Sequence, residues 1–288
     1  MRQTGKLLAL LWFAAFIFLD PTTPTAHATP STELWTPAIM DVQPFGVWHL
    51  GIDNYFTVGR NPATSGAFPT DVGMTVGVLP FTKLNAEVGI DLLEPIEFVC
   101  GGAQKSPGVF LTGNGAGPTA CPSVWDGLSF NAKIGIPEGT FFGQQPGVNI
   151  GIFNVGTVKN VTDMDILDLI VGKTIPVLGR IHGGAYIGNA GSALMHEAGI
   201  RSGSTQNAGG IVAFDRGFWT VKEKDGTEYS KVSLLADYAT GKNYIGGAAV
   251  GAGFNFTPNI DVLTGPVWFN DHVINGAWKW TTQLDINF

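Results

Sequence analysis

The chain has 288 residues, of which 14% are charged and 40 are glycine, whereas charged residues make up about a quarter of an ordinary globular domain. Its formal net charge of −7 argues against a nucleic-acid-binding protein, because that function requires a basic surface. Hydrophobic residues make up 44%, yet beyond the N-terminus no apolar run reaches the roughly 20 residues of a membrane-spanning helix.

The N-terminus has the pattern of a secretory signal peptide. Arg2 and Lys6 precede the uncharged apolar run 7–19, and the small-x-small sequence Ala26-His27-Ala28 follows it. Because the run is too short to span a membrane comfortably, we expect cleavage after Ala28 rather than a membrane anchor. Residues 1–28 are therefore predicted to be a signal peptide, and the mature chain is predicted to be exported.

Residues 29–45 contain Pro30, Pro37 and Pro44, and we interpret them as a periplasmic lead-in. From residue 46 onward, apolar and polar residues alternate with period 2, which predicts half-buried β-strands. The clearest strands are 84–92 and 128–136. Twelve strands are predicted, beginning near residues 47, 72, 84, 128, 148, 165, 181, 210, 231, 248, 260 and 277.

The final stretch, 278–288, alternates over its whole length and ends on Phe288. It resembles the closing strand of bacterial outer-membrane β-barrel proteins of the porin-like class. The resemblance implies an all-β fold, in which residues 46–288 form a closed antiparallel transmembrane β-barrel with about 12 strands in an up-and-down meander. It also implies outer-membrane lipid and the barrel-assembly machinery as partners. The machinery would recognise an assembly signal formed by Trp280, Leu284, Ile286 and Phe288.

Two observations support the barrel over a soluble exported β-domain, which would alternate in the same way. The apolar faces of the strands carry no charge, and aromatic residues gather near strand ends, as in the interfacial girdles of membrane barrels. The longest predicted loops also fall on one side of the barrel and most short turns on the other, which is the outer-membrane pattern.

The polar faces of the strands are predicted to line the lumen. Opposite charges there could pair with one another as internal struts, or they could line a path for small polar solutes. Glu87 and Asp91 are expected beside Lys133. Closure of the barrel is expected to bring Asp53 beside Lys279 and Asp285. The predicted lumen residues are His49, Asp53, Tyr55, Glu87, Asp91, Lys133, His182, Tyr186, Lys231, Asp237, Lys279 and Asp285.

Cys100 and Cys121 lie in a Gly/Pro-rich loop, and their spacing is not that of a metal site. Because the periplasm is oxidising, we expect a disulfide between them, with two free thiols as the alternative.

We expect no enzyme and no cofactor. His49 and His182 could act as bases in an outer-membrane hydrolase, but no Gly-x-Ser-x-Gly motif accompanies them. His196-Glu197 lacks the second histidine of a zinc motif, so no metal site is predicted either. Porin-like passage of small polar solutes is the favoured function. The alternatives are a structural or adhesive barrel with a plugged lumen and functional surface loops, and an outer-membrane hydrolase.

Overall fold

The computed structural model describes residues 32–56, 58, 70–94 and 127–288. The predicted signal peptide, 1–28, lies outside the described residues. So do Cys100 and Cys121, and their disulfide stays a prediction.

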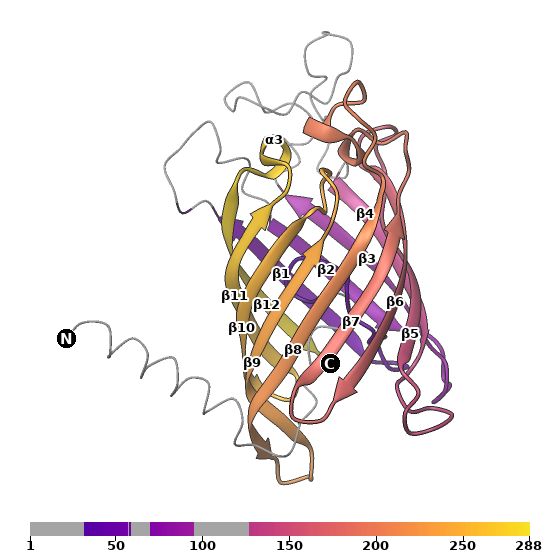
Figure 1. Ribbon diagram of the computed structural model, residues 1–288. Helices are drawn as coiled ribbons and strands as arrows, with labels where there is room; N and C mark the ends of the chain where they lie inside the picture. Colours follow the sequence, from indigo (N-terminus) through magenta and orange to yellow (C-terminus); the bar gives the residue numbers. More distant parts are fainter. Residues whose placement is uncertain (1–31, 57, 59–69, 95–126) are drawn as a thin grey trace, which may run out of the picture.

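Twelve antiparallel strands close into one barrel in which each strand pairs with its neighbours in sequence, so the predicted fold and strand number are confirmed (Figure 1). Within the described part of the chain, no helix is long and apolar enough to cross a membrane. The strands are β1 (Trp48–Phe56), β2 (Thr70–Gly77), β3 (Asn85–Glu94), β4 (Leu128–Ile136), β5 (Gly147–Gly156), β6 (Asp163–Ile175), β7 (Gly179–Ile187), β8 (Ala208–Lys222), β9 (Glu228–Ala239), β10 (Gly247–Thr257), β11 (Ile260–Phe269) and β12 (Trp278–Asn287).

The seam between β1 and β12 closes the barrel. His49 pairs with Asn287 and Phe56 with Trp280 across this seam. Beyond the last strand residue, the N–H of Phe288 donates to Trp48 O and the N–H of Trp48 donates to Phe288 O, both at 2.9 Å. The terminal residue therefore extends the ladder, and neither of the two strands presents an unpaired edge there, as a barrel in lipid requires.

The two faces of the wall differ in polarity. Outward side chains in mid-strand are apolar and exposed, among them Val88, Ile134, Ile150, Leu169 and Val250. Trp48, Trp268, Trp278 and Trp280 lie near strand ends and are also exposed on the outside. The inner face holds most of the buried polar residues. This distribution is the reverse of a water-soluble sandwich and is that of a transmembrane barrel.

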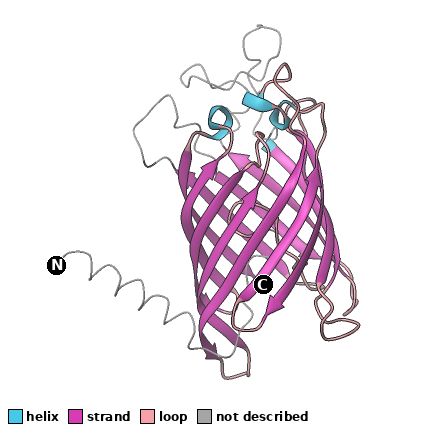
Figure 2. Cartoon of the chain, viewed as in Figure 1, coloured by secondary structure: helices cyan, strands magenta, loops and turns pink. Residues whose placement is uncertain are grey.

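The two ends of the barrel also differ, and Figure 2 shows the helical turns gathered at one of them. The connections 78–84, 137–146, 176–178, 223–227 and 258–259 lie at what we call the short-turn end. The long-loop end carries the connection 188–207, with η3 (Ala193–Met195) and η4 (Glu197–Gly199), and the connection 270–277, with α3 (His272–Asn275). Asp271 caps α3 by accepting from the N–H groups of Val273 and Ile274.

The described part of the predicted periplasmic lead-in, residues 32–45, lies inside the barrel rather than below it. Leu34, Ala38 and Ile39 have no exposed surface, and Leu34 and Ile39 pack with side chains of β9, β10 and β11. Near the short-turn end the segment leaves the lumen, where Phe45 bridges to Gly77 at the end of β2. We call residues 32–45 the inner segment. The physical reason is that polar side chains of the inner wall supply hydrogen-bond partners for the backbone of this segment, which has no strand pattern of its own.

A lysine on the outer face should destabilise the barrel in proportion to its depth in the membrane. Leu169→Lys, in the middle of β6, is expected to cost about 2–4 kcal/mol because the ammonium would face hydrocarbon. Leu178→Lys is the matched control: its leucine is almost equally exposed, 47% against 48%, but lies in the turn after the same strand. Urea titration of protein folded into lipid vesicles, followed by heat-modifiable gel migration, measures both. Equal losses would contradict a lipid-facing wall at Leu169.

Candidate functional site

The inner segment is held by hydrogen bonds from its backbone to side chains of the wall. The N–H groups of Leu34 and Trp35 both donate to Asp237 Oδ2 at 2.8 Å. Leu34 O accepts from Gln283 Nε2 at 2.6 Å and from the Tyr55 hydroxyl at 3.4 Å. The segment has no regular secondary structure, so these side chains replace the ladder that a strand would have.

Residues 39–43, the half of the segment nearer the short-turn end, are bound in the same way by side chains of β3, β4, β5 and β7. Ile39 O accepts from Asn149 Nδ2 at 2.7 Å, and Asp41 O accepts from Lys133 Nζ at 3.1 Å. The Gln43 N–H donates to Glu87 Oε2 at 2.5 Å, and Glu87 Oε1 lies 3.6 Å from Lys133 Nζ. The predicted Glu87–Lys133 pair thus forms, and it contacts the inner segment as well as the wall. Asp91 is not beside Lys133, contrary to the prediction, because the register of β3 and β4 places it opposite Ser129.

Trp35 anchors the turn of the segment. Its ring lies edge-on to Phe269 and Tyr55, with centroids 4.9 and 5.2 Å apart, and 6.0 Å from Tyr244. Its indole Nε1–H donates to Ile245 O at 2.8 Å. A tryptophan whose polar group is satisfied and whose faces are packed by aromatics fixes the segment laterally as well as along the barrel axis.

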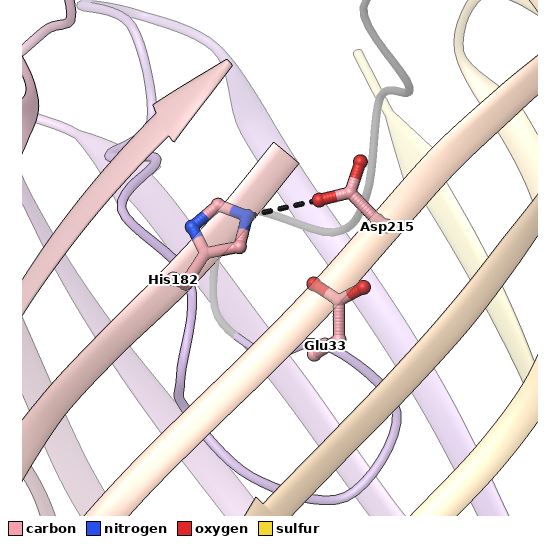
Figure 3. A group of neighbouring side chains, drawn as sticks. All are labelled: Glu33, His182 and Asp215. Carbon is pink, nitrogen blue, oxygen red and sulfur yellow. Dashed lines mark hydrogen bonds and ion pairs between the residues drawn. The ribbon is translucent and has the colours of Figure 1, made fainter. Parts of the chain in front are cut away.

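A buried charge cluster ties the segment to β7 and β8 (Figure 3). Arg180 Nε contacts both carboxylate oxygens of Asp215, at 2.9 and 3.0 Å, and Arg180 Nη1 contacts Asp41 Oδ2 at 2.5 Å. His182 Nε2 lies 2.9 Å from Asp215 Oδ2, while its Nδ1 lies 3.1 Å from the Met40 N–H. Glu33 points toward the same group and is fully buried, and neither of its oxygens has a hydrogen-bond partner.

Glu33, His182 and Asp215 are close enough to suggest a metal site, since one ligand atom from each lies within 4.8 Å of the others. The hydrogen bonds do not fit one. Because the Met40 N–H donates to Nδ1, neutral His182 carries its proton on Nε2 and donates it to Asp215. A metal on Nε2 would need that proton removed, and the Nδ1–H form would clash with Met40. The cluster is better described as a hydrogen-bonded latch, with Glu33 held as a neutral acid because a buried, unpartnered carboxylate is costly.

Beside the inner segment the lumen contains a cavity with a volume of about 170 Å³. It extends from Thr162, Leu194 and Tyr244 at the long-loop end to Thr75 and Glu87, where Gln43 contacts the wall. Among the described residues, one lysine and one histidine, Lys133 and His49, line it. Six carboxylates line it as well: Asp53, Asp71, Glu87, Asp91, Asp168 and Asp285.

The strand register gathers part of this acidic wall. Asp53 pairs directly with Asp71 across β1 and β2, and Gly73 pairs with Asp91 across β2 and β3. Asp91 Oδ1 lies over Gly73, where any larger residue would collide with it. Because glycine leaves this space, the Asp91 carboxylate leans toward β2. Three neighbouring strands thus place carboxylates on one side of the cavity.

Several of these oxygens have donors and others do not. Asp91 Oδ2 accepts from Asn131 Nδ2 at 2.5 Å, and Asp168 Oδ1 accepts from the Gly151 N–H at 2.9 Å. Asp285 Oδ1 lies 3.2 Å from His49 Nε2. Asp71 Oδ1 is a buried atom without a hydrogen-bond partner, whereas the Asp285 carboxyl group shares a hydrogen bond with Asp261, which lies opposite it on β11. This wall therefore holds more carboxyl groups than the basic side chains that line the cavity can pair with.

The residues predicted to line the lumen all belong to inward positions of their strands, but they divide into three groups. His49, Asp53, Tyr55, Glu87, Asp91, Lys133 and Asp285 line the cavity. Asp237 and His182 bind the inner segment instead. The third group contacts neighbouring loops or side chains of the wall: Tyr186 donates to Thr240 O, Lys231 contacts Tyr229 and Phe256 O, and Lys279 lies over the Phe269 ring.

Lys279 is not beside Asp53, contrary to the prediction. The seam register places Gln283 opposite Asp53 and Asp285 opposite Gly51, while Lys279 lies beyond the end of β1, toward the long-loop end. The physical reason is that alternation predicts which residues face the lumen but does not determine which residue of β12 pairs with which residue of β1. Asp53 therefore has no basic residue opposite it on β12, and the acidic wall is more acidic than the sequence suggested.

Sequence reasoning missed Glu33, Trp35, Asp71, Arg180 and Asp215. Asp71 and Arg180 are each the second residue of a strand, β2 and β7, whose predicted start was late by two residues. Asp215 was the last residue of the predicted strand 210–215, which in the structure continues as β8 to Lys222. Glu33 and Trp35 could have been predicted only if the inner segment had been placed in the lumen. The one sequence feature that pointed there was a tryptophan, Trp35, within a proline-rich stretch.

No protein-family model matches the chain, and no curated protein matches its sequence. Solved structures do match. A mutant of the Rh. blastica porin is 10% identical over 92% of this chain and 71% of its own, with a TM-score of 0.38. An outer membrane channel from Pseudomonas putida F1 is 10% identical over 86% and 97%, with a TM-score of 0.43. The translocator domain of the autotransporter NalP from Neisseria meningitidis is 11% identical over 84% and 86%, with a TM-score of 0.31. Similarity at this level says nothing about what this chain binds or transports.

The two acids of the latch should respond differently to replacement by the corresponding amides. Asp215→Asn is expected to lower the free energy of unfolding by about 3–5 kcal/mol, because buried Arg180 loses the carboxylate that contacts its Nε. Glu33→Gln is expected to change the free energy of unfolding by less than about 1 kcal/mol, because Glu33 has no hydrogen-bond partner to lose and the glutamine that replaces it is also neutral. Urea unfolding in vesicles measures both variants. A larger loss for Glu33→Gln than for Asp215→Asn would show that Glu33 is ionised and paired.

Proposed function

We propose that this chain is a bacterial outer-membrane channel that passes small cationic solutes and that its inner segment keeps the path closed at rest. The observation that carries the proposal is the carboxylate-lined cavity beside the inner segment. Fixed charge on the wall of a narrow lumen concentrates ions of the opposite sign and repels those of the same sign.

The inner segment supports the second half of the proposal. Among the described residues, the cavity is lined by Thr162, Leu194 and Tyr244 toward the long-loop end and by Glu87, which binds Gln43, toward the short-turn end. Below that point the chain continues against the wall, with the Gly46 N–H donating to Gly77 O at 2.9 Å. A continuous path to the short-turn end therefore requires residues 43–46 to move. Residues 34–43 are tied by side chains rather than by a ladder, so beyond them only the backbone contacts of Phe45 and Gly46 to Gly77 must break for the segment to leave, and the pairing between the twelve wall strands stays intact.

The alternative of a structural barrel with a permanently plugged lumen has its own support. The same hydrogen bonds and the packing of Leu34 and Ile39 would also suit a segment that never moves. In that case the function would belong to the surface loops. A protein that inserts into bilayers, unfolds cooperatively and never conducts would favour this alternative and overturn the channel.

The selectivity of the path should depend on the acidic wall. In planar bilayers with a KCl gradient, the mature protein is expected to show a reversal potential whose sign indicates a preference for cations. Asp53→Asn combined with Asp71→Asn is expected to move that potential toward zero, because two of the fixed charges are lost. Asp225→Asn, in the exposed turn between β8 and β9, is the control and should leave it unchanged. An unchanged potential in the double variant would contradict passage along this wall.

Loosening the anchor of the inner segment should open the channel more often. Removing the ring of Trp35 costs the closed state roughly 3–5 kcal/mol of packing. If the segment must move for conduction, Trp35→Ala should raise the opening frequency at least about tenfold, since about 1.4 kcal/mol corresponds to a factor of ten. Trp219→Ala, on the exposed outer surface of β8, is the matched control. The gating role fails if both variants open as rarely as the native chain.

A further inference from the structure

The cavity beside the inner segment has two unlike walls, one acidic and one aromatic. Asp53, Asp71 and Asp91 come from three neighbouring strands on one side. The aromatic side chains that line it are Trp35, Tyr55, Phe153 and Tyr244. Tyr55 and Tyr244 both pack against Trp35, with ring centroids 5.2 and 6.0 Å from that of Trp35. Their surface is therefore a fixed part of the cavity.

The acidic wall also contains a buried oxygen that lacks a donor, Oδ1 of Asp71. Asp285 lines the cavity with only 3% of its surface exposed, and its carboxyl group shares a hydrogen bond with that of Asp261, which lies opposite it on β11. Leaving the Asp71 oxygen unpaired costs free energy, and a cation entering the cavity would supply the missing partner.

We propose that this cavity binds the ammonium group of a small organic amine, with the carboxylates accepting its N–H groups or facing its charge and the aromatic rings facing its carbon atoms. This inference names the solute class for the proposed cation path and rests on that function. Carboxylates opposed to aromatic faces are the combination that recognises organic ammonium ions, because the ring quadrupole attracts a cation while the ring surface packs against methylene or methyl groups.

A bare metal ion fits the cavity less well. Calcium requires six to eight oxygens converging at 2.3–2.6 Å. Among the described residues, the one group with ligand atoms gathered closely enough for a metal is Glu33, His182 and Asp215, which belongs to the latch. The cavity carboxylates are instead spread over β1, β2, β3, β6 and β12. An elongated cation with several donors can reach such a set, whereas a point charge cannot.

The inference also explains why Lys133 does not neutralise the wall. Its ammonium already contacts Glu87 Oε1 at 3.6 Å and Asp41 O at 3.1 Å, at the end of the cavity next to the inner segment. It therefore leaves Asp71 and Asp53, which lie two and three strands away on β2 and β1, to a mobile cation. A ligand ammonium would take the position that a further lysine would occupy in a wall made only of struts.

Isothermal titration of the folded mature protein in detergent tests the site without any need for conduction. The probes are tetramethylammonium chloride and 1,4-diaminobutane dihydrochloride, with sodium chloride and calcium chloride at equal ionic strength as comparisons. Saturable binding of at least one amine at a stoichiometry near one, and weaker or absent binding of sodium and calcium, is expected. Calcium binding without amine binding would overturn the proposal, as would no saturable binding at all.

Variants then assign the binding to the two walls. Asp53→Asn combined with Asp71→Asn should weaken amine binding at least about tenfold through loss of the charge-assisted contacts. Tyr244→Leu keeps the site apolar but removes a π-face, so it should weaken tetramethylammonium more than 1,4-diaminobutane. Asp225→Asn is the control, and circular dichroism with heat-modifiable migration shows that each variant is folded. Unchanged amine affinity in the folded double variant would place binding elsewhere.

The two proposals fail in different ways. A protein that binds amines by titration but never conducts would leave the site standing and overturn the channel. A protein that conducts with cation preference but binds no amine would leave the channel standing and overturn the site. In a conducting protein that binds, added tetramethylammonium should block potassium current, and the block should weaken in the Asp53→Asn and Asp71→Asn double variant.

Discussion

The structure depends on the need to satisfy the backbone of a segment that has no secondary structure and no bulk water around it. Each buried N–H or C=O without a partner costs as much as a lost hydrogen bond, and more when no water can replace it. In residues 34–43 the partners are side chains of the wall: Asp237, Gln283, Asn149, His182, Lys133 and Glu87. The inner face is polar for this reason as well as for any solute, and a polar lumen alone is not evidence of a pore.

The inner segment also divides the charges of the lumen into two sets. Those on β7 and β8 are compensated within the protein, where Arg180 holds Asp215 and Asp41 and neutral His182 completes the group. Those on β1, β2 and β3 face the cavity, and the register gives Asp53 another aspartate, Asp71, as its neighbour. Struts and a charge-lined path were rival interpretations of one set of residues. The two interpretations apply to different sides of the same lumen.

The wall could be predicted from the sequence because each strand of a membrane barrel needs apolar residues on its lipid face and tolerates polar residues only on its lumen face. Apolar residues such as Val88 and Ile90 must face lipid, and Glu87 and Asp91 must not, so period 2 is clear over 84–92. The same rule located Glu87 opposite Lys133, because that pair lies on adjacent strands with a matched register. Where one of the two requirements is absent, as in the extension of β8 toward Trp219, the strand was predicted too short.

The candidate site was less predictable because its parts meet through closure and through the inner segment. A shift of two residues in the β1–β12 register would have put Lys279 closer to Asp53, and alternation is unchanged by such a shift. Residues 32–45 obey neither the period of a strand nor that of a helix, so nothing local placed them in the lumen. Their partners are up to 249 positions away in sequence, as for Leu34 and Gln283. A pattern within one window cannot encode such contacts.

Apolar packing sets how readily the inner segment can leave. Leu34 and Ile39 are fully buried against Leu235, Leu263 and Val267, and each contributes about 1.5–3 kcal/mol by leaving water. With Trp35 added, displacement of the whole segment exposes enough apolar surface to keep an open state rare. A solute that binds open and closed states equally cannot change that balance, however tightly it binds. An ammonium ion in the cavity would therefore open the path only if it competes with the contacts that residues 41–43 make to Lys133 and Glu87, and those two side chains are where solute binding and closure meet.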